Sequence, residues 1–288
     1  MSFIDFASSL WTNFQNSSQL FPYLYKELDR KYNPNTKIRK LKESDADLET
    51  SLYGKVCIIT GGSRGIGSEV VKVLLKKECH VITGSSSKSE SEHIKRHDQL
   101  MADIPKGRGK LDIWHLDLKS MNSVSNFAKR FKQTGLPLNY FIANAGIMSQ
   151  KNEKLTEDNF EGHLAVNYLS HCLLIDHFLD ALHETAKTSR SESRIVLVSS
   201  AMHRVGTIKF NDPQLKATRA TTYLAYGQSK LAQIMFANRM TRWLEETGND
   251  WRQSITVNSL HPGICNTELL THMPMVQELK PMAAQAFR

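Results

Sequence analysis

A phenol and an ammonium group stand four residues apart in the segment TTYLAYGQSK, residues 221–230, as Tyr226 and Lys230. Positions i and i+4 of a helix share one face, so the two side chains can meet if the segment is helical. A lysine held there favours the phenolate and lowers the pKa of the tyrosine. Such a pair could move a proton at a substrate oxygen. Tyrosine and lysine also stand at this spacing on solvated helix faces, so the rest of the chain has to decide.

A glycine-rich segment, TGGSRGIG, covers Thr60 to Gly67 between a predicted buried strand and a predicted helix. Gly61 permits a tight turn, Gly65 lets the backbone approach a pyrophosphate, and Gly67 lets the helix pack close to the strand. The helix N-terminus would offer free N–H groups to the phosphates. Glycine clusters alone are weak signals, but the strand–loop–helix context favours a dinucleotide site.

The end of the second predicted strand bears on the choice of dinucleotide. An acidic residue there would bind the ribose hydroxyls and select NAD, whereas this chain has Gly84, Ser85 and Ser86. Arg64 in the glycine loop could pair with a 2′-phosphate. We therefore predict NADP(H) as the cofactor and regard NAD(H) as less favoured. The alternative for Arg64 is a solvated loop residue.

These groups need a scaffold, and strand and helix patterns alternate from Tyr53 onward. Strands are predicted at 55–60, 80–84, 110–118, 138–146, 194–200 and 254–263, and helices at 68–77, 123–133, 157–186 and 221–246. Continuous Val/Ile/Leu strands between amphipathic helices predict a doubly wound α/β fold with a mostly parallel sheet. The polar stretch at 84–98 is expected on the surface.

The chain divides into a segment over residues 1–50 and a dinucleotide-binding domain over 51–288. The first fourteen residues place large apolar side chains at helical spacing: Phe3, Phe6, Leu10, Trp11 and Phe14. A basic stretch, KIRKLK, follows this amphipathic aromatic helix. Residues 1–25 are thus a candidate peripheral membrane contact, and packing on the domain itself or on a partner subunit is the alternative.

Composition excludes several classes of protein. The 288 residues are 40% hydrophobic and 23% charged, as in soluble globular proteins. Neither an apolar run of about 18 residues nor a secretory signal pattern occurs. Four widely spaced cysteines match no metal pattern and favour a reducing, intracellular compartment, either the cytoplasm or a membrane surface. The net charge of +8 favours anionic partners, but no nucleic-acid-binding motif accompanies it.

Together the motifs resemble the short-chain dehydrogenase/reductase family. Thr-Gly-x-x-x-Gly-x-Gly, Ala-Asn-Ala-Gly, a serine after the fifth strand and Tyr-x-x-x-Lys occur in the family's order over residues 53–288. VSSAMHRVG and HPGICNT are similar to the retinol-dehydrogenase and WW-domain-oxidoreductase branch. The resemblance implies a Rossmann-type fold. It also implies an NADP(H)-dependent oxidoreductase that interconverts a lipophilic alcohol (retinoid, polyprenoid or steroid-like) and its carbonyl by hydride transfer.

The family pattern implies a role for each matching residue. Tyr226 would exchange the proton, Lys230 would support its phenolate, and Ser200 would orient the substrate oxygen. Asn167 would hold a water beside Lys230. The residues implied for cofactor binding are Thr60, Gly61, Ser63, Arg64, Gly65, Ile66, Gly67, Ser86, Asp117, Leu118, Asn144, Ala145, Gly146, Tyr226, Lys230, Gly263, Ile264 and Thr267.

The sequence departs from the family pattern at three places. Ala143 stands where an asparagine is common, and Ser86 where many NADP-dependent relatives have an arginine. The sequence also ends before the family's last strand and helix, which would expose a sheet edge that tends to recruit another chain or to aggregate. A homodimer is a candidate assembly. This end keeps an alternative open: a non-catalytic nucleotide-binding or interaction protein. Epimerases and dehydratases of the same fold usually need larger substrate domains.

Overall fold

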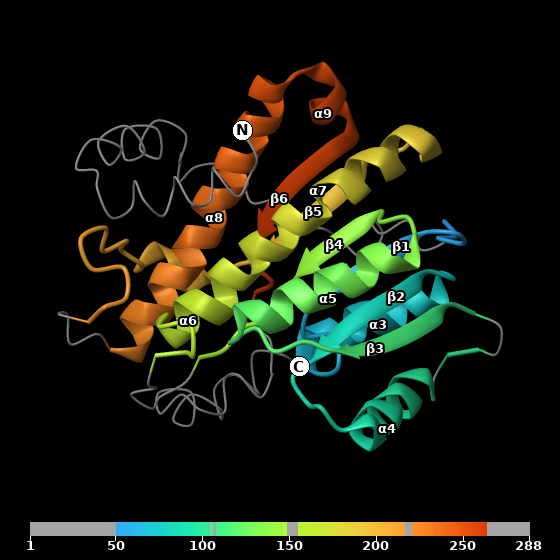
Figure 1. Ribbon diagram of the computed structural model, residues 1–288, viewed down its shortest axis with the longest axis horizontal. Helices are drawn as coiled ribbons and strands as arrows, with labels where there is room; N and C mark the ends of the chain where they lie inside the picture. The colour runs from blue at the N-terminus through green and yellow to red at the C-terminus, as the bar shows by residue number, and fades with distance from the viewer. Residues whose placement is uncertain (1–49, 103, 106–107, 149–154, 217–220, 264–288) are drawn as a thin grey trace, which may run out of the picture.

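The computed structural model describes residues 50–102, 104–105, 108–148, 155–216 and 221–263 (Figure 1). The expected N-terminal amphipathic helix and its membrane contact lie outside these residues. Ile264 and Thr267 also lie outside them. So do the other residues from 264 to 288, to which the prediction about the family's last strand and helix applies. Among the described residues, no helix is long and apolar enough to cross a membrane.

The described strands form one parallel sheet. In chain order they are β1 (Val56–Ile59), β2 (His80–Ser85), β3 (Lys110–His115), β4 (Tyr140–Ala143), β5 (Ser193–Val198) and β6 (Ile255–Leu260). Their order across the sheet is β3-β2-β1-β4-β5-β6, and every neighbouring pair is parallel. The order reverses at β1, which lies between β2 and β4. Ligands of doubly wound sheets bind beyond the carboxyl ends of the strands at such a switch point.

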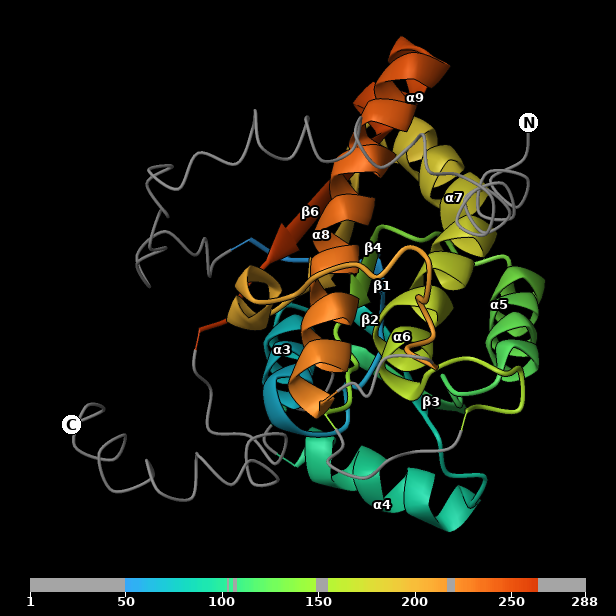
Figure 2. The same cartoon turned by 90° about the vertical axis from the view of Figure 1, so that its left-hand side faces the viewer.

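Helices cover both faces of this sheet, as predicted (Figures 1 and 2). The helical segments are α3 (Gly65–Lys76), α4 (Glu90–Met101), α5 (Met121–Thr134), α6 (Gly162–Leu164), the π-helix η2 (Ala165–Leu169), α7 (Ser170–Ser189), the 3-10 helix η3 (Ala201–Arg204), α8 (Thr222–Thr247) and α9 (Asn249–Ser254). Side chains alternate along β1: Cys57 and Ile59 pack in the cluster that includes α3, while Ile58 packs in the larger cluster with α5, α7 and α8.

Residues 86–98 lie at the surface, as predicted for the polar stretch 84–98, but Gly84 and Ser85 are buried and Glu90–Met101 form a helix, α4, that was not predicted. The Ser89 hydroxyl accepts a hydrogen bond from the Glu92 amide and caps the helix, and Glu90 and Glu92 suit its first turn electrostatically. Leu100 is the only fully buried residue of this helix. Because so little of α4 is apolar, hydrophobic periodicity does not reveal it.

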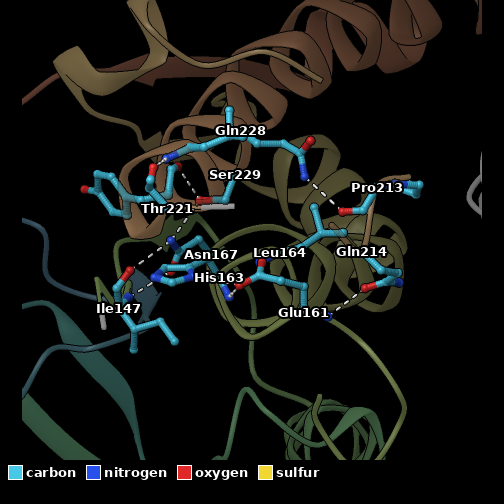
Figure 3. A network of polar contacts seen from close by, with 12 residues as sticks. Ile147, Glu161, His163, Leu164, Asn167, Pro213, Gln214, Thr221, Gln228 and Ser229 are labelled. Atoms are coloured by element: carbon cyan, nitrogen blue, oxygen red, sulfur yellow. Dashed lines mark hydrogen bonds and ion pairs between the residues drawn. The ribbon is translucent and has the colours of Figure 1, made fainter. Parts of the chain in front are cut away.

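The long helix predicted at 157–186 also differs from the structure. Residues 157–161 are not helical, with a turn and bend over 157–159, and the helix begins at Gly162. The Glu161 carboxylate accepts the amide hydrogens of His163 and Leu164, so Glu161 caps the helix (Figure 3). A π-helical turn, η2, then interrupts the α-helical path. Such turns displace the side chains of one helical turn and occur frequently at functional sites.

Candidate active site

The predicted site residues follow the carboxyl ends of the strands. The strands predicted at 110–118, 138–146 and 254–263 end earlier in the structure, at His115, Ala143 and Leu260. The residues after these ends form loops, and they include Asp117, Asn144 and Gly263. These strands were predicted too long because an apolar pattern does not show where backbone pairing with the neighbouring strand ends.

The glycine loop has a backbone geometry that suits a phosphate ligand. Gly61 and Gly65 have φ values of 65° and 57°, in the left-handed region that favours glycine. A Cβ at Gly67 would lie 2.2 Å from the Gly61 carbonyl oxygen and 2.6 Å from Nδ2 of Asn144. Gly67 therefore makes room for the loop itself rather than for the strand. The loop ends at the N-terminus of α3, where amide hydrogens point outward, so the residues fit a dinucleotide pyrophosphate.

Thr60 and Asn144 tie the glycine loop to the end of β4. The Thr60 hydroxyl accepts the amide hydrogens of Asn144 and Ala145 at 3.1 and 3.0 Å. The Asn144 side chain donates to the carbonyl oxygens of Thr60 and Gly61 at 2.9 and 3.2 Å. The Asn144 side chain thus shapes the glycine loop by binding two carbonyl oxygens of the loop's backbone. Gly146, two residues further on, lies beside Asn167 and Lys230, since a Cβ there would come within 3.3 Å of both Asn167 Oδ1 and Lys230 Nζ.

Tyr226 and Lys230 lie on α8, as the helical spacing predicted, and both are buried, with 4% and 3% of their surfaces exposed. Nζ of Lys230 lies 5.6 Å from the centre of the Tyr226 ring and donates to the carbonyl oxygen of Val198 at 2.8 Å. Burial lowers the pKa of Lys230 to about 7. The lysine is therefore poised between its charged and neutral forms near neutral pH.

The expectation that Lys230 lowers the pKa of Tyr226 is wrong for the cofactor-free structure. Burial raises the pKa of the phenol, and a hydrogen bond with the Ser200 side chain acts in the opposite direction. The Ser200 side chain thus lies near enough to the phenol of Tyr226 to act on its pKa. The Ser200 hydroxyl also accepts the Met202 amide hydrogen at 3.3 Å and caps η3, which fixes the position of Ser200 after β5.

Asn167 lies in the π-helix η2 and is fully buried. Its Oδ1 accepts the Ile147 amide hydrogen at 2.8 Å, and its Nδ2 donates to the Ile147 carbonyl oxygen at 3.1 Å and to Ser229 Oγ at 2.9 Å (Figure 3). The side chain is therefore committed to protein partners that hold η2 against α8. The water-holding role of Asn167 stays a prediction.

Four further residues predicted to bind the cofactor lie in the glycine loop or after the ends of β2, β3 and β6. Ser86 is exposed after β2, and Arg64 is exposed within the loop. Asp117 uses Oδ1 to accept the Lys119 amide hydrogen at 2.9 Å, which forms a local turn after β3. Gly263 has a φ of 86° and is the last described residue. Their contacts with a dinucleotide stay predictions.

Sequence reasoning missed two polar side chains that reach this site. Arg96 on α4 donates from Nη1 to Ser63 Oγ in the glycine loop at 3.0 Å, while its Nη2 lies 3.8 Å from Glu92. His171 on α7 lies between Thr60 and Asn167. No local signal pointed to Arg96, because α4 itself was not predicted. His171 could have been noticed, since it stands four residues after Asn167 in a helical pattern.

The arrangement combines two chemical capacities at one end of the sheet. The loop with its helix N-terminus can bind phosphates, and the neighbouring hydroxyls of Ser200 and Tyr226 can bind one oxygen atom and exchange its proton. Among the described residues, no three His, Cys, Asp or Glu side chains gather in a way that could hold a metal ion. The phosphate-binding loop and the two hydroxyls together suit proton exchange at an alcohol or carbonyl oxygen beside a dinucleotide.

Comparison with known proteins agrees with this chemistry. A family model described as short chain dehydrogenase matches residues 55–275. The polyprenol dehydrogenase of Danio rerio is 36% identical over 237 residues, which cover 82% of this chain and 70% of that protein. Human polyprenol dehydrogenase is 35% identical over 76% of this chain and 63% of its own length, and human retinol dehydrogenase 11 is 35% identical over 82% and 69%. The chain thus spans about two thirds of the length of these relatives.

Solved structures support the same fold. The Pseudomonas aeruginosa RhlG/NADP active-site complex covers 80% of this chain and 81% of its own, with a TM-score of 0.60 and 23% identity. The NADH-dependent reductase A1-R′ complexed with NAD has a TM-score of 0.56 at 20% identity and covers 74% of this chain and 80% of its own. At these identities the likeness concerns the fold alone, and both dinucleotides occur among the similar structures.

Proposed function

The chain belongs to the short-chain dehydrogenase/reductase family, and we propose that it is an NADP(H)-dependent oxidoreductase that interconverts a lipophilic alcohol and its carbonyl. The observation that carries this proposal is the buried pair of Tyr226 and Lys230 one helical turn apart on α8, with the Ser200 side chain near enough to lower the pKa of the phenol. A buried tyrosine with a serine hydroxyl and a lysine nearby can bind a substrate oxygen and exchange its proton, which an ordinary surface tyrosine cannot do.

Each catalytic group has a role that its surroundings support. The nicotinamide, when bound, supplies or accepts the hydride at the substrate carbon. Tyr226 gives a proton to the carbonyl oxygen during reduction and takes the alcohol proton during oxidation. Ser200 donates a hydrogen bond to that oxygen and holds it in place. Because burial raises its pKa, Tyr226 starts as a phenol in the cofactor-free protein, which suits proton donation.

The preference for NADP(H) is supported by charges at the adenosine end of the glycine loop. The end of β2 has Ser85 and Ser86 and no carboxylate that would repel a 2′-phosphate. Two guanidinium groups are nearby in the fold: that of Arg64 within the loop and that of Arg96, hydrogen-bonded to Ser63. Guanidinium groups suit phosphate recognition through paired hydrogen bonds.

A lipophilic substrate is supported by the relatives and by apolar side chains beside the catalytic groups. Val205 and Tyr223 are 65% and 38% exposed. Gly206 lies against Gly227, since a Cβ at Gly206 would come within 2.3 Å of the Gly227 carbonyl oxygen. This contact brings Val205 close to the turn of α8 that carries Tyr223 and Tyr226. Similarity to polyprenol and retinol dehydrogenases agrees with such a surface.

The proposal is tested by binding followed by turnover. The purified chain is titrated with NADPH and with NADH by nicotinamide fluorescence, and is then assayed with retinaldehyde and a long-chain polyprenal. We expect tighter binding of NADPH and reduction of at least one of these aldehydes. Equal affinities would reject the cofactor preference alone. Cofactor binding without turnover of either aldehyde would reject the substrate class.

A further inference from the structure

His171 lies in the first turn of α7 and is fully buried, yet both of its ring nitrogens bond to other motifs. Nδ1 lies 3.0 Å from the main-chain carbonyl oxygen of Asn167 in η2. Nε2 lies 2.8 Å from the hydroxyl oxygen of Thr60, a residue 111 positions away at the end of β1. One imidazole therefore spans the distance between the catalytic π-helix and the glycine loop.

The hydrogen positions on His171 follow from its partners. A carbonyl oxygen can only accept, so Nδ1 carries the hydrogen. Burial lowers the pKa of His171 to about 4, so the ring is neutral near pH 7 and Nε2 accepts the Thr60 hydroxyl hydrogen. The Thr60 oxygen then accepts the amide hydrogens of Asn144 and Ala145. Every donor and acceptor named here has a partner, which makes a buried polar network rigid.

Each end of this network holds part of the proposed site. On the cofactor side, Thr60 and Asn144 hold the glycine loop through the bonds described above. On the catalytic side, Asn167 bonds to Ser229, the residue that precedes Lys230 on α8. His171 is the link between the two sets of bonds.

We propose that His171 is a positioning residue that holds the glycine loop and the π-helix η2 in register, so that cofactor affinity and proton-transfer geometry depend on the same imidazole. This inference rests on the proposed function. A histidine that only fills the core would affect stability, whereas a positioning residue affects cofactor affinity and turnover of the folded protein.

Two substitutions separate the two bonds of His171. In His171→Asn, the short amide can still donate to the Asn167 carbonyl in place of Nδ1, but it does not reach Thr60. In His171→Gln, the longer amide can still accept from Thr60 in place of Nε2, while the bond to Asn167 is lost. We expect His171→Asn to weaken NADPH binding about tenfold with a smaller loss in kcat. We expect His171→Gln to lower kcat about tenfold at saturating NADPH with a smaller loss in affinity.

His183→Gln is the matched control, because His183 is also buried on α7 but stacks on Trp251 and pairs with Asp250. It should leave the NADPH Kd and kcat unchanged even if the protein melts at a lower temperature. Two His171 variants that behave like this control would overturn the proposal while leaving the proposed function intact. If neither aldehyde is turned over by the wild type, the NADPH affinity of His171→Asn decides alone. A wild type that binds no cofactor would overturn both proposals.

A second pair of variants keeps the proposal testable if the His171 variants do not fold. Thr60→Val removes the hydroxyl at nearly constant volume, and Thr60→Ser retains it. We expect Thr60→Val to weaken NADPH binding at least as much as His171→Asn, and Thr60→Ser to bind nearly as the wild type does. Where His171→Asn folds, the double variant with Thr60→Val should lose less affinity than the two single losses combined. Additive losses, or equal affinities of Thr60→Val and Thr60→Ser, would contradict the coupling.

Discussion

The glycine loop and the proposed catalytic segment, formed by η2 and α8, meet at one end of the sheet, but they are built in opposite ways. The loop depends on backbone geometry, with Gly61 and Gly65 in left-handed conformations and Arg64 exposed. The catalytic segment depends on buried side chains, and the pKa values of Lys230 and Tyr226 are displaced by that burial. A phosphate needs many weak N–H donors, whereas a proton needs one group with a suitable pKa.

The largest effect is expected on the catalytic side. Tyr226→Phe removes the proton-exchanging hydroxyl and should lower kcat by about 10²–10⁴-fold, with the NADPH Kd almost unchanged. Steady-state aldehyde reduction and fluorescence titration measure the two quantities. Tyr53→Phe is the control, because Tyr53 is exposed ahead of β1, at the opposite end of that strand from the site, and should retain full turnover. Turnover of Tyr226→Phe at the wild-type rate would remove Tyr226 from its proposed role.

The next largest effect is expected in the glycine loop, where a substitution should weaken NADPH binding. Gly67→Ala puts a Cβ 2.2 Å from the Gly61 carbonyl oxygen, so the loop must shift and we expect NADPH affinity to fall by about two orders of magnitude. Gly135→Ala is the control, since its Cβ would have no neighbour within 4 Å and its φ of 65° costs only about 1 kcal/mol of stability. Equal NADPH affinities of these two variants would show that the close packing at Gly67 is not needed.

The third prediction concerns pH and the buried lysine. Folding lowers the pKa of Lys230 from 10.5 to about 7, so between these values the unfolded chain binds more protons than the folded one. The free energy of unfolding should therefore rise with pH across this window, by at most about 1.4 kcal/mol per pH unit from this group. Lys230→Met should remove this part of the rise in unfolding free energy with pH. Lys95→Met, on the exposed face of α4, should retain it. Urea unfolding at pH 7 and pH 9 makes the comparison, and parallel changes in wild type and Lys230→Met would refute it.

The smallest effect is expected at the exposed charges of the loop. Arg64→Ala and Arg96→Ala should each weaken NADPH binding about fivefold while leaving NADH binding unchanged, because partly exposed ion pairs contribute little. Lys95→Ala, next to Arg96 on α4, is the control and should affect neither cofactor. If both arginine variants lose NADPH and NADH affinity equally, the guanidinium groups do not recognise the 2′-phosphate.

Much of the fold could be predicted from local pattern. Short runs of Val, Ile and Leu indicate the parallel strands, because a strand covered on both faces is apolar throughout. Helix α4 was not predicted because Leu100 is its only fully buried residue, and a hydrophobic pattern needs several. The π-helix η2 was not predicted because its turn depends on packing rather than on residue type.

For the site, the sequence by itself determined which chemistry was present: the glycines of the loop and the identities of Ser200, Tyr226 and Lys230. Only the tertiary structure decided how deeply these groups are buried and which distant residues bond to the loop. Burial raises the pKa of the phenol against the effect expected of the lysine, and Thr60 meets His171 across 111 positions. Spacing along the sequence indicates only which residues are neighbours within one helix or strand. Desolvation and long-range hydrogen bonds depend on groups that only folding brings together.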